Sequence, residues 1–145
     1  MERTFLKRVR DLFFSLRVLP LLSIALLIWI TSSIPSSALP RYPIPHFDKI
    51  VHFAFYSLLA LGFAYLPGKE RWFRLRWRVF LFCLLGTALF GVLDEWRQSY
   101  VPGRVSSFFD WVVDFIAGFL VTLFYSIRLM LKQRKTGTPP SPLKR

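Results

Sequence analysis

Four long apolar runs alternate with shorter polar, charged or proline-rich segments along the chain. The runs cover residues 18–34, 47–66, 77–96 and 108–131. At a rise of about 1.5 Å per residue, a helix over any of these runs would cross most of a hydrocarbon layer of roughly 30 Å. The apolar residues form unbroken runs rather than amphipathic stripes, which is typical of segments buried in lipid. The pattern therefore predicts an all-α membrane protein, a bundle of four transmembrane helices.

The segments between the runs carry turn and interface signals. Residues 35–45 contain four prolines, which favour an extended loop. Residues 69–78 mix basic and aromatic side chains, as expected for a short helix lying in the headgroup layer. Pro102-Gly103 predicts a turn between the third and fourth runs, and Ser107 with Asp110 predicts a capping box at the start of the fourth helix.

The placement of the basic residues predicts the orientation in the membrane. A net charge of +12 would suggest nucleic-acid binding in a soluble domain. Here the Lys and Arg residues precede the first run, separate the second from the third, and follow the fourth. Only four of the 20 fall on the other side: Arg41, Lys49, Arg97 and Arg104. The positive-inside rule then places both termini in the cytoplasm, and no nucleic-acid partner is predicted.

The chain divides into three parts on this basis. Residues 1–17 form a basic cytoplasmic segment, 18–131 the transmembrane domain, and 132–145 a basic tail with too little apolar surface to order itself. The basic N-terminus, the first run and residues 36–38 also fit a cleavable signal peptide, which would leave the next segment starting outside. Cys83 is the only cysteine, so no intramolecular disulfide is predicted.

Ionisable and amide side chains interrupt the runs at one level, near the outer ends of the second, third and fourth helices. Spacings of four residues, as from Asp48 to His52 and from Asp110 to Asp114, put them on single helix faces. A lone charge there would cost several kcal/mol in lipid, so these groups are expected to face one another or a wet cavity. The predicted ligand-binding residues are Asp48, Lys49, His52, Asp94, Glu95, Gln98, Arg104, Asp110 and Asp114.

A purely structural explanation competes with this prediction for several residues. Asp48 and Asp110 lie where helix N-terminal caps are expected. Arg97 and Arg104 fit a packing network in which they pair with nearby acids. His52 alone is typical of a hydrogen-bonded polar residue. The sequence has no HExxH or G-x-S-x-G motif, so neither a metal, nor a cofactor, nor catalytic residues are predicted.

The order and spacing of these residues resemble the VanZ-like family of small bacterial membrane proteins. The resemblance rests on Asp48-Lys49-x-x-His52-x-x-x-Tyr56, Asp94-Glu95-x-x-Gln98-x-x-x-Pro102-Gly103-Arg104 and Asp110-x-x-x-Asp114-x-x-x-Gly118. It implies a multi-pass protein of the bacterial cytoplasmic membrane with a role in the cell envelope. The founding member is associated with resistance to the glycopeptide antibiotic teicoplanin. One departure is Asp114, where the family more often carries Asn.

Three classes of function remain open. The first is a binding protein whose outer site holds an anionic headgroup, such as a lipid-linked cell-wall precursor, with Lys49, Arg97 and Arg104 contacting phosphate. The second is an intramembrane enzyme that modifies a lipid headgroup, using His52 with the acids for proton transfer or as ligands of a divalent metal. The third is a small proton-linked carrier. A carrier of this size would need several copies to assemble, and so predicts a homo-oligomer.

Overall fold

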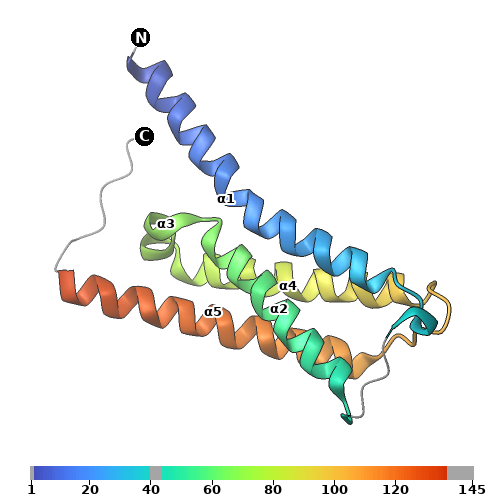
Figure 1. The fold of residues 1–145 in the computed structure, drawn as a ribbon. Helices are drawn as coiled ribbons and strands as arrows, with labels where there is room; N and C mark the ends of the chain where they lie inside the picture. The colour runs from blue at the N-terminus through green and yellow to red at the C-terminus, as the bar shows by residue number, and fades with distance from the viewer. Residues whose placement is uncertain (1, 40–43, 137–145) are drawn as a thin grey trace.

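The protein is helical throughout the part of the chain that the structure describes. The computed structural model describes residues 2–39 and 44–136, with side chains from residue 16 onward. Its elements are α1 (Glu2–Ser32), the short 3-10 helix η1 (Ser36–Ala38), α2 (Phe47–Tyr65), α3 (Gly68–Arg74), α4 (Arg76–Gln98) and α5 (Phe108–Thr136). Figure 1 shows α2, α4 and α5 packed together, with α1 along one side of them.

The surface of the bundle is apolar, as in a membrane protein. Helices α2, α4 and α5 are each long and apolar enough to cross a membrane, and α1 adds a shorter apolar stretch, Leu16–Ser32. Only 28–33% of each long apolar segment is buried inside the protein, and most of the remaining leucine, isoleucine and phenylalanine side chains face outward. Exposing such an apolar surface to water would be unfavourable, whereas contact with lipid chains is not. The described chain therefore fits a helical membrane bundle.

The predicted runs at 47–66, 77–96 and 108–131 are confirmed as helices, and the segment at 69–78 contains the short helix α3. The start of the first helix was wrong, because α1 begins at Glu2 and holds Pro20 in its interior. Its early residues are mostly good helix formers, so nothing stops the helix there. The boundary of the tail was also wrong, because α5 continues to Thr136. The rest of the tail lies outside the described residues.

Helix α2 occupies the centre of the bundle. It packs most extensively on α5 and also touches α4 and α1, whereas α1 meets α4 only lightly. Small residues allow these close approaches, as is common between membrane helices. A Cβ added at Gly62 would lie 3.0 Å from the Leu21 Cα on α1, and one added at Gly118 would lie 2.9 Å from Thr87 Cγ2 on α4. Gly62 and Gly118 thus set how closely α1 and α4 approach their neighbours.

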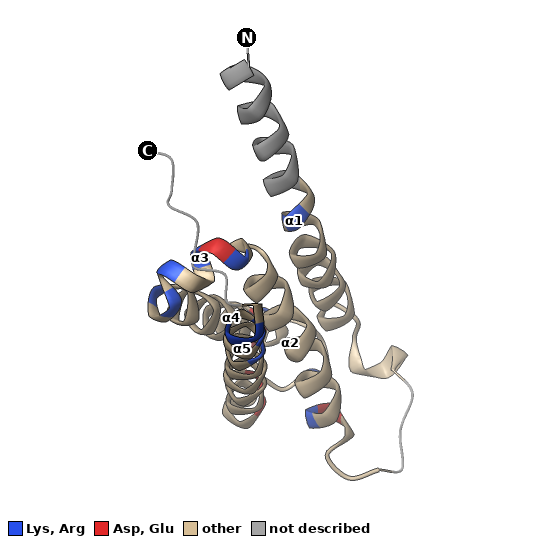
Figure 2. Ribbon diagram, turned by 90° about the vertical axis from the view of Figure 1, so that its left-hand side faces the viewer, with Lys and Arg blue, Asp and Glu red and all other residues tan. Residues whose placement is uncertain are grey.

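The two ends of the bundle differ in character. At one end, on the right of Figure 1, α1 and α4 finish and α2 and α5 begin. There the two connecting loops touch, because the Ser36 N–H donates to the Pro102 carbonyl at 3.3 Å, and Gly103, at φ +74°, packs against Ser36. The opposite end carries α3, whose Trp72 indole donates to the Ala64 carbonyl at 2.7 Å. The basic residues coloured in Figure 2 gather over α3 and the end of α5.

Enlarging Gly118 is expected to separate α4 from α5. Gly118→Leu forces a side chain against Thr87, and overpacking of this kind typically costs about 1–3 kcal/mol. The free energy of unfolding in detergent micelles measures the effect. Ala54→Leu is the matched control, because Ala54 lies on the exposed face of α2. Equal stability of the two variants would contradict the close α4–α5 contact.

Candidate functional site

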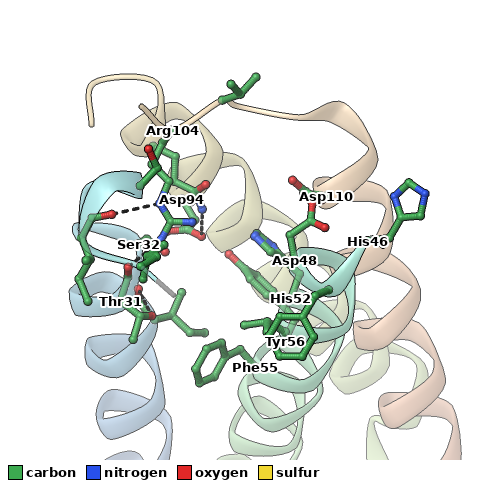
Figure 3. Close-up of a pocket in the computed structure, with 18 of the residues that line it drawn as sticks. Thr31, Ser32, His46, Asp48, His52, Phe55, Tyr56, Asp94, Arg104 and Asp110 are labelled. Atoms are coloured by element: carbon green, nitrogen blue, oxygen red, sulfur yellow. Dashed lines mark hydrogen bonds between the residues drawn. The ribbon is translucent and has the colours of Figure 1, made fainter. Parts of the chain in front are cut away.

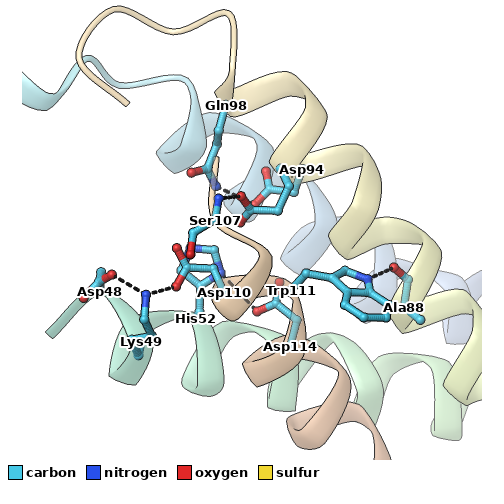
Figure 4. A network of polar contacts seen from close by, with 11 residues as sticks. Asp48, Lys49, His52, Ala88, Asp94, Gln98, Ser107, Asp110, Trp111 and Asp114 are labelled. Atoms are coloured by element: carbon cyan, nitrogen blue, oxygen red, sulfur yellow. Dashed lines mark hydrogen bonds and ion pairs between the residues drawn. The ribbon is translucent and has the colours of Figure 1, made fainter. Parts of the chain in front are cut away.

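An ion-pair chain joins the starts of α2 and α5. Lys49 Nζ lies 2.9 Å from Asp48 Oδ2 and also bonds to Asp110 Oδ1. Asp48 is largely exposed, with 56% of its side chain accessible, whereas Asp110 is 8% exposed. Both residues lie in the first turns of their helices, where a negative charge is favourable beside the free N–H groups. Lys49 therefore joins two acids that already suit their positions (Figure 4).

A second pair lies one helical turn deeper. His52 Nδ1 and Asp114 Oδ1 are 3.0 Å apart, and the Asp114 side chain is fully buried. The Tyr56 ring follows one turn further along α2 and stacks on the His52 ring, with centroids 6.0 Å apart and planes nearly parallel. A spacing of three residues on α2, from Lys49 to His52, and of four on α5, from Asp110 to Asp114, therefore gives two layers of contact between the helices, an ion pair outside and a histidine–carboxylate pair inside.

The end of α4 supplies the third side of the site. Glu95 Oε2 accepts a hydrogen bond from the Ser107 N–H at 2.7 Å, and the Gln98 amide donates to Asp94 Oδ2 at 2.9 Å. The predicted capping box at the start of α5 is therefore wrong, because Asp110 is not the acid that accepts the Ser107 N–H. Glu95 takes the Ser107 N–H that Asp110 was expected to take, because the Asp110 carboxylate bonds to Lys49.

Several buried polar atoms of this site have no hydrogen-bond partner among the described residues. They are Asp94 Oδ1, Glu95 Oε1, Asp114 Oδ2 and the Tyr56 hydroxyl. One ligand atom each from His52, Glu95 and Asp114 lie within 4.8 Å of one another. Buried carboxylate oxygens are normally bonded, and leaving one unbonded costs on the order of 1–3 kcal/mol. The inner layer thus has spare acceptor capacity that the outer ion pair lacks.

The two arginines of this end hold the end of α1. Arg104 donates from Nε to the Ile34 carbonyl at 3.2 Å and from a terminal nitrogen to the Thr31 carbonyl at 3.0 Å. Arg97 donates to the Trp29 carbonyl at 3.0 Å and lies 4.2 Å above the Trp29 ring. The last carbonyls of a helix lack partners within it, so a guanidinium group is well suited to them. The prediction that these arginines pair with acids in a packing network is wrong.

A cavity of about 620 Å³ opens between α1 and α2 at this end of the bundle. Figure 3 shows side chains from both helices and from the loop after α4 around it. Its apolar lining includes side chains of α1 and α2, for example Ile28, Val51 and Phe55, whereas α4 and α5 contribute polar and charged side chains and α2 contributes both kinds. Six of the predicted site residues line it: Asp48, His52, Asp94, Gln98, Arg104 and Asp110. The other three are neighbours of lining residues: Lys49, Glu95 and Asp114.

Sequence reasoning left out several residues that line the cavity. Tyr56 carried a signal, because it follows His52 by four residues on α2. Thr31 and Ser32 end an apolar run on α1, and nothing local distinguishes them from other small residues there. Their place at the cavity depends on how α1 packs against α2, which is a contact between distant parts of the chain. His46 immediately precedes α2 in a left-handed conformation, with φ 56°, and could not be singled out either.

Comparison with known proteins found no matching family model, no matching curated protein and no matching solved structure. The resemblance to the VanZ-like family therefore stays a prediction from the motifs themselves.

Shortening the Arg104 side chain is expected to loosen the end of α1. Arg104→Lys keeps the charge but cannot reach both carbonyls, so the free energy of unfolding should fall by about 1 kcal/mol, and by about 2 kcal/mol in Arg104→Ala. Chemical unfolding in micelles measures both. Arg78→Lys at the exposed start of α4 is the control and should change little. Wild-type stability in Arg104→Ala would mean that these bonds contribute nothing.

Proposed function

We propose that the protein crosses the bacterial cytoplasmic membrane four times, with both termini in the cytoplasm and the cavity at the outer surface. The distribution of charge supports this orientation, since the basic residues of α3 and of the end of α5 gather at the end opposite the cavity (Figure 2). Positive charge is retained on the cytoplasmic side of membrane proteins. The apolar part of α1, Leu16–Ser32, supplies the fourth span and carries a basic residue, Arg17, at its start.

Cysteine labelling tests this orientation in intact cells. A membrane-impermeant maleimide should modify Ser37→Cys and Ser106→Cys, which are exposed beside the cavity, and should spare Thr136→Cys. The native Cys83 is buried, so it gives little background. Labelling of Thr136→Cys without cell lysis would reverse the assigned orientation.

The cavity holds the anionic headgroup of a membrane lipid. The observation that carries this proposal is the mixed character of its wall, which combines apolar side chains from α1 and α2 with polar and charged side chains from α2, α4, α5 and the loop after α4. An amphiphile can place its first chain atoms against the apolar side and its headgroup against the polar side. Arg104 lines the cavity, and the α1 carbonyls take only two of its five N–H donors.

The favoured ligand is a lipid-linked cell-wall precursor. The motifs shared with the VanZ-like family support it, because the founding member is associated with resistance to an antibiotic that acts at the outer face on such precursors. A phosphate attached to a long polyprenyl chain also has the required chemistry, with charge at one end and hydrocarbon at the other. The protein would then act in the cell envelope by holding or presenting this headgroup.

Binding of a polyprenyl phosphate is expected to stabilise the purified protein, by about 2.7 kcal/mol when the lipid is present at a hundred times its Kd. Polyprenol of the same chain length has the hydrocarbon without the phosphate and should have little effect. Val51→Phe fills the cavity from α2 and should abolish the stabilisation, whereas Ala54→Leu on the exposed face should not.

Unfolding in micelles with each added lipid gives the result directly. Equal stabilisation by polyprenol would remove the headgroup from the proposal. Equal stabilisation by phosphatidylglycerol would identify the ligand as an anionic phospholipid rather than a wall precursor.

A second candidate function is chemical modification of the bound headgroup. It is favoured by His52, which lines the cavity and is oriented by its bond to the buried Asp114. A histidine held by a carboxylate in this way is a common general base. Loss of lipid turnover with unchanged lipid binding in His52→Gln would identify this function.

A further inference from the structure

The inner layer of the site contains more negative charge than its described neighbours compensate. Asp114 is fully buried and Glu95 is 7% exposed, and each has one carboxylate oxygen without a hydrogen-bond partner among the described residues. The only described basic side chain bonded to either of them is His52. A buried carboxylate without a compensating charge is costly in a membrane, so the excess requires a physical explanation.

The other cations of this end are engaged elsewhere. Lys49 bonds to Asp48 and Asp110 in the outer layer. Arg97 and Arg104 donate to carbonyls at the end of α1. The backbone N–H of Ser107 satisfies one oxygen of Glu95, and the other is buried without a partner among the described residues. A bound cation would compensate both carboxylates at once.

We propose that His52, Glu95 and Asp114 bind a divalent metal ion. One ligand atom from each lies within 4.8 Å of the others, which is close to the separation of about 4.2 Å between opposite ligands on a metal with bonds of about 2.1 Å. His52 Nδ1 and Asp114 Oδ1, at 3.0 Å, match the separation of two adjacent ligands around an octahedral ion with such bonds. The ion would replace the proton between them, and a movement of the Glu95 carboxylate towards the pair would complete the set.

The ligand types select among the common ions. One imidazole nitrogen with two carboxylates suits Mn²⁺ or Zn²⁺, because imidazole disfavours Mg²⁺ and Ca²⁺ whereas oxygen ligands disfavour soft ions. No thiolate takes part, since Cys83 is buried in a hydrophobic cluster with Trp72 of α3 and Val79 of α4. Three protein ligands leave positions for water or for an oxygen of a bound molecule, as in metal sites that act on substrates.

The ion would also give the site an attraction for phosphate that its acids do not provide. His52 lines the cavity, so a metal held by it can meet a headgroup oxygen directly. This role of the ion rests on the proposed function, but the presence of the ion does not. A titration with metal alone therefore tests the site without any lipid.

The experiment uses the full chain, purified in detergent with a tag that contains no histidine. Equilibrium dialysis against Mn²⁺ and, separately, Zn²⁺ should give about one tightly bound ion of at least one of these metals per chain. Glu95→Gln and Asp114→Asn keep the side-chain shape and should each weaken this binding at least about tenfold. Glu70→Gln, which changes an exposed acid of α3 at the opposite end of the bundle, is the matched control and should bind as the wild type does.

The two histidines of the chain provide a direct spectroscopic test. Electron spin echo modulation of bound Mn²⁺ should show coupling to an imidazole nitrogen, which His52→Gln removes and His46→Gln leaves in place. For Zn²⁺, His52→Gln should lower the binding affinity and His46→Gln should leave it unchanged. The wild-type spectrum and titration decide the matter even where a variant fails to fold.

Failure to bind either ion, or equal binding in the wild type and in Glu95→Gln, would overturn the metal site. Metal binding without stabilisation by polyprenyl phosphate would keep the metal site and reject the headgroup. Lipid binding without metal would do the reverse.

Discussion

The cost of exposing charge to lipid determines how α2 and α5 fit together. Apolar side chains can pack against one another in many registers, because lipid offers nearly the same contacts as a neighbouring helix. The acids at the start of α5 allow far fewer. Asp110 and Asp114 must meet Lys49 and His52, and a slip of one turn would leave at least one carboxylate against lipid or hydrocarbon. The contacts between these four side chains therefore specify a register that the apolar surfaces alone would not.

The cavity follows from the way in which α1 is attached. Its middle packs closely on α2 where Gly62 admits Leu21. Its end is held by Arg97 from the last turn of α4 and by Arg104 from the loop that follows. Helix α1 thus closes one side of the bundle without filling the site. The space left between its end and α2 is lined by polar residues of four helices, α1, α2, α4 and α5. The arginines have a structural role first, and only Arg104 also faces the cavity.

The sequence allowed the helices and the level of the charged residues to be predicted, because long apolar runs and spacings of four are local signals. It also predicted which residues would gather, since lipid leaves buried polar groups few other places. It did not allow the partners to be assigned. Arg104 was expected beside acids or phosphate and instead bonds to the carbonyls of Thr31 and Ile34, some 70 residues away in sequence. The hydrogen-bond partners of Arg104 depend on where α1 ends in space, and no local sequence pattern predicts that position.

The charged end of the bundle divides into two parts with different chemical consequences. In the outer part, Lys49 and its two acids satisfy one another, and the geometry of helix N-termini explains why the acids are there. In the inner part, Glu95 and Asp114 keep unpartnered oxygens although they are the more buried pair. If these contacts served packing alone, the more buried carboxylates would be expected to have the more complete set of hydrogen bonds. The inner residues are therefore the ones whose arrangement requires something beyond the fold, and the cavity beside His52 gives a ligand access to them.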